Sequence, residues 1–181
     1  MAYNSFPYLC IFLPLCWAAW ALLPQRYRPA ALLGGSLIFY WLMAGTYTFW
    51  LLLAAALTWL LGRWLGSLQA LQAATTSGLE RDARKAAKQK FTTMQKSVVA
   101  AGVAGLLGLL IWLKYLPFLA RSLNALLAQL PFGWQVSAPS FVQPVGLSFF
   151  TLMAMSYLFD VRRGTIRPAE HYWQVLLYLS F

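Results

Sequence analysis

Acidic residues, and charged residues in general, are scarce in this chain. Only four of its 181 residues are Asp or Glu, and all charged residues together make up 10% of the sequence. Soluble domains usually carry about 25% charged residues, so this composition excludes a mostly aqueous surface. Apolar residues account for 61%, and Trp, Tyr and Phe are plentiful. The composition therefore indicates a protein whose outer surface faces a lipid bilayer.

Residues that usually bind metals or carry out catalysis are equally rare. Cys10 and Cys16 lie six positions apart in one apolar run, where a helix turns them away from each other. We therefore expect buried, inert thiols. His171 is the only histidine, and no serine, cysteine or second histidine is placed to complete a catalytic set. The sequence thus predicts no metal site and no catalytic residue, with His171 at the surface.

Long apolar segments predict an all-α, polytopic membrane protein. A helix needs about 20 residues to cross the hydrocarbon layer. The first apolar run is not a secretory signal peptide, because no basic residue precedes it and no small-residue cleavage site follows. We expect five complete spans and the start of a sixth: 6–23, two helices within 30–61 separated at 44–46, 97–119, 141–159, and a last segment from Tyr172.

Positive charge is concentrated between these apolar segments. Fourteen Lys and Arg residues give a formal net charge of +10. The basic clusters lie at 26–28, at 63–96 and at 162–167. With the N-terminus outside, all three fall on the cytoplasmic side, as basic loops usually do. This placement favours the lipid bilayer and its anionic headgroups as partners, rather than nucleic acid. We expect 63–96 to be a cytoplasmic basic loop, in which 79–95 is either a surface amphipathic helix or solvated chain.

Small and hydroxyl-bearing residues suggest where helices pack. Ala101 with Gly105, and Ala104 with Gly108, are small residues four positions apart and predict close helix–helix contact. The fifth span contains Ser148, Thr151 and Ser156, of which the first two share one helical face with Met155, and Ser156 lies beside it. These hydroxyls are candidates for the wall of a polar cavity. Hydrogen bonding between or within helices is the alternative, which physical arguments favour.

Three parts of the chain carry a more specific pattern. They are Phe12-Leu13-Pro14 with residues 36–40, then Trp112-Leu113-Lys114-Tyr115, and then the series 144–151, 156–164 and 177–181. This series resembles the membrane-bound O-acyltransferase (MBOAT) family, and especially the bacterial branch typified by alginate O-acetylases. The resemblance covers nearly the whole chain. It implies a bacterial cytoplasmic-membrane enzyme that transfers acyl groups, most often acetyl, to hydroxyls of an extracellular polysaccharide.

Members of this family are usually more than twice as long, and their catalytic histidine lies beyond the tract that matches here. The resemblance therefore implies that residues 1–181 are a single N-terminal portion of an MBOAT-type domain, truncated at the C-terminus and inactive alone. It implies acetyl-CoA or another acyl thioester as the donor of the full-length protein, with no cofactor bound by this chain. It also implies a periplasmic or extracellular acetylation partner, and places Ser148 and Thr151 as cavity-wall or packing groups.

Two other functions compete with this one. A non-catalytic membrane scaffold, or partner-binding subunit, would use the same apolar helices without any reaction. A transporter is suggested by the Pro and Gly residues at 144–146. The absence of an internal repeat, and the near absence of ionisable residues from the spans, argue against transport.

Overall fold

The computed structural model describes residues 10, 13–77, 81–127 and 146–180, and within them the protein is all-α, as expected. No strand occurs in these residues. The helices are α1 (Leu13–Leu22), α2 (Arg28–Ala44), the short 3-10 turn η2 (Gly45–Tyr47), α3 (Thr48–Thr76), α4 (Arg81–Leu110), the π-helical turn η3 (Ile111–Tyr115), α5 (Leu116–Leu127), α6 (Leu147–Arg163) and α7 (Tyr172–Ser180).

Two continuous helical stretches, 28–76 and 81–127, are long and apolar enough to cross a membrane. The described parts of α1 and α7 are shorter, at 10 and 9 residues. At 1.5 Å per residue each would cover only about 15 Å, roughly half of the hydrocarbon thickness. Membrane-type helices are therefore present, whereas five complete spans and the position of the N-terminus remain predictions.

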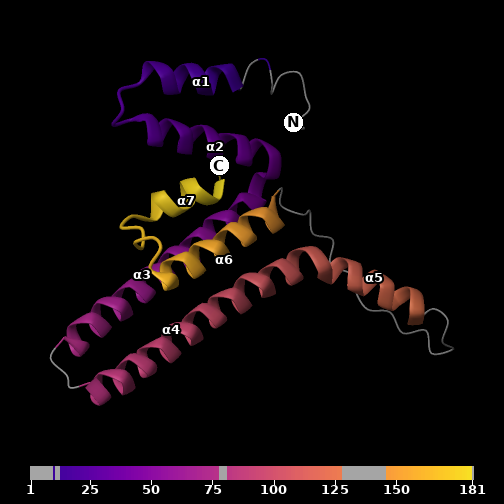
Figure 1. The fold of residues 1–181 in the computed structure, drawn as a ribbon. Helices are drawn as coiled ribbons and strands as arrows, with labels where there is room; N and C mark the ends of the chain where they lie inside the picture. Colours follow the sequence, from indigo (N-terminus) through magenta and orange to yellow (C-terminus); the bar gives the residue numbers. More distant parts are fainter. Residues whose placement is uncertain (1–9, 11–12, 78–80, 128–145, 181) are drawn as a thin grey trace.

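The expected break between the second and third spans is confirmed. α2 ends at Ala44, and Gly45 follows with a φ of +54°, a backbone conformation that glycine adopts at little cost. The Thr48 hydroxyl donates a hydrogen bond of 2.7 Å to the Gly45 carbonyl and so satisfies a group at the new helix start. Figure 1 shows that α3 leaves this turn in a different direction from α2.

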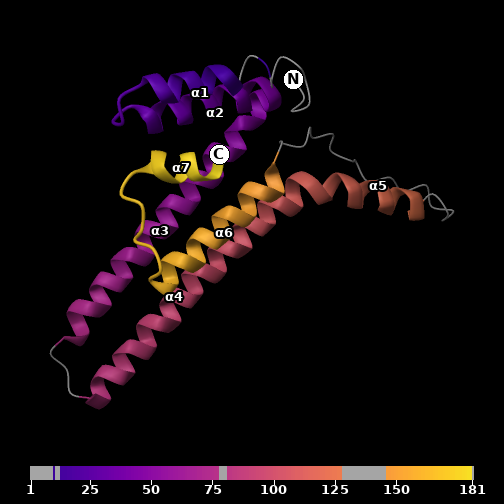
Figure 2. The same ribbon diagram turned by 45° about the horizontal axis from the view of Figure 1, so that its top comes forward.

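Helices α3, α4 and α6 run alongside one another and form the core (Figures 1 and 2). Leu51, Leu65, Leu106, Leu158 and Val161 are almost completely buried between them or against α7. α7 begins at Tyr172, as predicted, and contacts both α2 and α3. Its Tyr172 hydroxyl donates to the Leu52 carbonyl of α3 at 3.0 Å. The chain therefore returns into the space between two earlier helices.

The segment 63–96 differs from the loop that the sequence predicted. α3 continues to Thr76 and α4 begins at Arg81, so the described residues form a helical hairpin (Figure 1). The alternative prediction, a surface helix over 79–95, is closer to the structure. However, the observed helix α4 continues into the fourth apolar segment and is not a separate helix. Ala, Gln, Lys and Arg have high helix propensity, so a hydrophilic composition did not imply an irregular chain.

The expected helix end near Pro117 is also wrong. The helix passes from α4 through η3 into α5 and ends at Leu127. Proline lacks an N–H group and its ring crowds the carbonyl four residues earlier, which usually stops a helix. Here the wider π-helical turn directly precedes α5, and such a turn accommodates the altered hydrogen bonding. Residues 116–127 are therefore the end of a longer helix.

Close packing occurs at other small residues than those predicted. Ala101, Ala104, Gly105 and Gly108 are all exposed, and a Cβ atom added at either glycine would meet nothing within 4 Å. The α4 glycine that contacts another helix is Gly102, because an added Cβ would lie 2.7 Å from a Leu61 methyl group of α3. Spacing alone identified a small-residue stripe but did not show which side of α4 faces the bundle.

Two glycines of α3 are also in close contact with other parts of the chain. A Cβ at Gly62 would lie 2.7 Å from the ring of Tyr157, and one at Gly66 would lie 2.5 Å from the ring of Pro168. The Tyr157 hydroxyl in turn accepts a 2.9 Å hydrogen bond from the backbone N–H of Ala169. These contacts hold the connection between α6 and α7 against α3.

Candidate functional site

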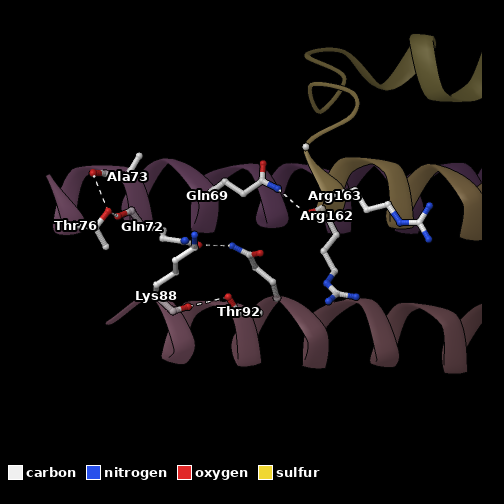
Figure 3. Close-up of a pocket in the computed structure, with 10 residues that line it drawn as sticks. Gln69, Gln72, Ala73, Thr76, Lys88, Thr92, Arg162 and Arg163 are labelled. Carbon is white, nitrogen blue, oxygen red and sulfur yellow. Dashed lines mark hydrogen bonds between the residues drawn. The ribbon is translucent and has the colours of Figure 1, made fainter. Parts of the chain in front are cut away.

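A polar pocket of about 420 Å³ lies where the C-terminal half of α3, the N-terminal half of α4 and the end of α6 meet (Figure 3). The residues that line it are Gln69, Gln72, Ala73, Thr76, Lys88, Thr92, Gln95, Arg162, Arg163 and Gly164. On α3 and α4 these residues recur every three or four positions, which is the spacing of one helical face. The two faces meet because the hairpin is helical on both sides.

Three glutamine side chains fix the walls of this pocket. Nε2 of Gln69 donates to the Val161 carbonyl at 2.7 Å, and this carbonyl also accepts from the backbone N–H of Gly164 at the end of α6. Nε2 of Gln95 donates to Oε1 of Gln72 at 2.9 Å and links α4 to α3. Gln95 is buried, so this bond also satisfies a polar group that would be costly to leave unpaired. The walls are therefore held by bonds between different helices.

Among the residues that the structure describes, the charges lining the pocket are all positive. They belong to Lys88, Arg162 and Arg163, and no described acidic residue lines it. Figure 3 shows the Lys88 side chain reaching toward Gln72, and Arg162 extending from α6 toward α4, whereas Arg163 points away along α6. α6 ends at Gly164, whose φ of +77° closes the helix and leaves both arginines in its last turn. Such a site attracts anions and can donate hydrogen bonds to them.

A second polar contact lies at the other end of α6. Nζ of Lys114, in η3, donates to the Ser148 hydroxyl at 2.9 Å, and the same Nζ lies 5.8 Å from the ring centroid of Tyr115. Both Lys114 and Ser148 are half-buried. Ser148 and Gly164 are roughly 24 Å apart at 1.5 Å per residue, so the contact and the pocket are separate sites. The ammonium group can stabilise a negative charge beside Ser148, but no base from residues 13–77, 81–127 or 146–180 makes a hydrogen bond to the hydroxyl.

The three predicted cavity-wall residues have different surroundings in the structure. Thr151 is fully buried and its hydroxyl donates to the Leu147 carbonyl of its own helix at 2.6 Å. Ser148 contacts Lys114, and Ser156 is exposed. The Thr151 hydroxyl therefore makes a hydrogen bond within its own helix, as the alternative interpretation expected. The role of the three residues as cavity wall stays a prediction.

Of the residues expected to be inert, His171 lies where the sequence predicted and Cys10 does not. His171 is exposed, as predicted, with its ring stacked 6.4 Å from that of Trp173. Cys10 is exposed rather than buried, and the side chain of Cys16 lies outside the described part. Among the described residues no group of three His, Cys, Asp or Glu side chains could hold a metal ion.

Sequence analysis missed the glutamines of the pocket, although a signal was present. Gln69, Gln72 and Thr76 on one side, and Lys88, Thr92 and Gln95 on the other, follow helical spacing. Because 63–96 was expected to be a loop, that spacing was not used.

Three known proteins are similar to this chain over most of its length. The probable alginate O-acetylase AlgI of Pseudomonas aeruginosa is 31% identical over 172 residues, which are 94% of this chain and 29% of that protein. The corresponding proteins of Azotobacter vinelandii and Pseudomonas putida are 32% and 30% identical over 91% of this chain, and it covers 29% and 30% of them.

This chain therefore spans less than one third of the length of these relatives. No protein-family model matches it, and no solved structure does. The predicted resemblance to the alginate O-acetylase branch of the membrane-bound O-acyltransferase family is confirmed by these relatives, over nearly the whole of this chain.

Proposed function

We propose that this chain is the N-terminal part of a membrane-bound O-acyltransferase that transfers acetyl groups to hydroxyls of an extracellular polysaccharide. The observation that carries the proposal is the 30–32% identity, over more than nine tenths of the chain, to three proteins named as probable alginate O-acetylases. The two long apolar helical stretches agree with a membrane enzyme. No described feature favours the scaffold alternative over this function.

In this proposal the chain supplies part of the membrane frame, and the reacting groups lie in the rest of the enzyme. His171 is the only histidine in the sequence, and it is exposed and stacked on Trp173. It is therefore not the general base. The donor, acetyl-CoA or another acyl thioester, approaches from the cytoplasm, and a periplasmic or extracellular partner protein presents or receives the polysaccharide.

The arrangement around α6 supports a position across the bacterial cytoplasmic membrane. Lys114 and Ser148 form a polar contact at one end of this helix, and Arg162 and Arg163 lie at the other. The distance between these ends, roughly 24 Å by helix rise, is close to the ~30 Å of hydrocarbon. Charged side chains at such a separation fit the two interfaces. With the N-terminus outside, Arg162 and Arg163 face the cytoplasm.

Genetic complementation tests the proposal. A bacterium that lacks its polysaccharide O-acetylase gene is supplied with the gene for the whole protein to which this chain belongs. Acetate released by alkali from the purified polysaccharide should return, and should stay absent when only residues 1–181 are supplied. Failure of the whole protein in several polysaccharide-producing hosts would contradict O-acetyl transfer. Acetylation by residues 1–181 that His171→Ala abolishes would contradict the location of the general base.

A further inference from the structure

We propose that the pocket between α3, α4 and the end of α6 binds a phosphate group, with Lys88 and Arg162 as its cationic ligands and Gln72 as a neutral donor. This site is separate from the Lys114–Ser148 contact and does not depend on the acyl-transfer function. The argument rests on the charges, the hydrogen bonds and the position of the pocket (Figure 3).

The first observation is that the cations of the pocket lie together without an acidic residue from the described part of the chain. Lys88, Arg162 and Arg163 line one pocket, and no described Asp or Glu lines it. Cations gathered in one place repel each other, and the repulsion is relieved when an anion binds between them. Arg162 is half-buried and extends toward α4, so its guanidinium group is partly shielded from solvent. An anion there would be screened less by salt than one on an open surface.

The second observation is the pattern of donors that remains after the internal hydrogen bonds are made. Oε1 of Gln72 accepts from Gln95, which leaves the Gln72 amide nitrogen as a donor beside the Lys88 side chain. The Thr92 hydroxyl donates to the Lys88 carbonyl at 2.8 Å, so its proton is already used. The Lys88 ammonium and the Gln72 amide thus lie together, and the Arg162 guanidinium lies further along the same pocket, so the three groups offer donors alone (Figure 3). A phosphate group, with several acceptor oxygens, matches this set better than a carboxylate with two.

The third observation concerns size and place. A pocket of about 420 Å³ is larger than one phosphate group and leaves room for the molecule that carries it. It lies at the arginine-bearing end of α6, beside the basic first half of α4. Two sources of phosphate meet these conditions: the headgroup of an anionic phospholipid, and a soluble phosphorylated molecule. They share the same chemistry at Lys88 and Arg162.

The test measures binding by the purified protein in phosphatidylcholine nanodiscs. In one arm, native mass spectrometry counts the phosphatidylglycerol molecules retained as this lipid replaces phosphatidylcholine. In the other arm, isothermal titration calorimetry follows inorganic pyrophosphate. Lys88→Gln and Arg162→Gln should each weaken binding about tenfold in whichever arm shows it, because each removes a charge-assisted hydrogen bond. Lys88 is exposed and Arg162 is only partly buried, so the variants should fold normally.

Lys85→Gln is the matched control, because it removes one positive charge from the same helix at an exposed position that does not line the pocket. It should change affinity less than twofold. Equal losses for Lys85→Gln and Lys88→Gln would overturn the proposal in favour of general surface attraction. Absence of binding in both arms would overturn it as well. Binding of phosphatidylglycerol alone identifies a lipid headgroup as the ligand, and binding of pyrophosphate identifies a soluble molecule. Neither result depends on acetylation.

Discussion

Gly62 and Gly66 allow other side chains to approach the backbone of α3. Gly66→Ala would place a methyl group 2.5 Å from the Pro168 ring, which cannot rotate away. We expect the free energy of unfolding to fall by about 1–3 kcal/mol, the usual cost of an overpacked contact. The measurement is the thermal unfolding midpoint in detergent. Gly105→Ala is the control, since an added Cβ there meets nothing within 4 Å. An equal or smaller loss at Gly66 than at Gly105 would contradict the close contact.

The Tyr157 hydroxyl makes a second, separable contribution to the same region. Tyr157→Phe keeps the ring against Gly62 but leaves the N–H group of Ala169 without its 2.9 Å acceptor. We expect a loss of about 1 kcal/mol, the typical value for one hydrogen bond. Tyr178→Phe is the matched control because this ring is 42% exposed and packs against Tyr157 at 6.4 Å. Unchanged unfolding midpoints for both variants would show that the hydroxyl of Tyr157 contributes nothing.

For single residues, the sequence predicted features that depend on local chemistry. It did not predict contacts that depend on how distant segments pack. A break at 44–46 was predicted because the uncharged stretch 30–61 is too long for one span, and Gly45 adopts its positive φ there at little cost. The contact between Lys114 and Ser148 was not predicted, because the two residues are 34 positions apart and their contact depends on how two helices align. The pairing of Gln72 with Gln95 was unpredicted for the same reason.

At the level of elements, the helical hairpin is the main departure from the expected loop. Ala86 lies in the exposed part of α4, which begins at Arg81. Ala86→Pro should disrupt the first turns of α4 at a local cost of about 3 kcal/mol, because proline removes one hydrogen bond and clashes with the preceding turn. Hydrogen exchange of amides 85–95 is the measurement. These amides should be protected in the parent and exchange faster in the variant.

Ala86→Ser provides the comparison, because serine is exposed there without breaking the backbone ladder and should leave protection nearly unchanged. Rapid exchange of amides 85–95 in the unaltered protein would show that this stretch is the solvated chain that the sequence allowed. The starts and ends of elements were predicted well at Gly45 and Tyr172, where a glycine or a change in polarity marks them. The continuation past Pro117 was not, since a π-helical turn has no simple sequence signal.

For the whole molecule, the membrane topology is the prediction with the widest consequence. With Cys10 and Cys16 replaced by serine, single cysteines are introduced at the exposed positions Thr46, Ala86 and Ile166. A membrane-impermeant maleimide applied from outside should label Thr46→Cys in cells with a permeabilised outer membrane. It should label Ala86→Cys and Ile166→Cys only after the inner membrane is opened. Labelling of Thr46 and Ala86 from the same side would contradict the arrangement in which all basic clusters are cytoplasmic.

The contact between Gly66 and Pro168 also matters while the protein is being synthesised. Ribosomes add about 5–20 residues per second, and roughly 100 residues separate these two positions, so α3 exists for about 5–20 s before its partner emerges. Throughout that interval the two glycines of α3 face lipid or a membrane chaperone instead of Tyr157 and Pro168. The nascent protein therefore carries an open groove that only its later part can close.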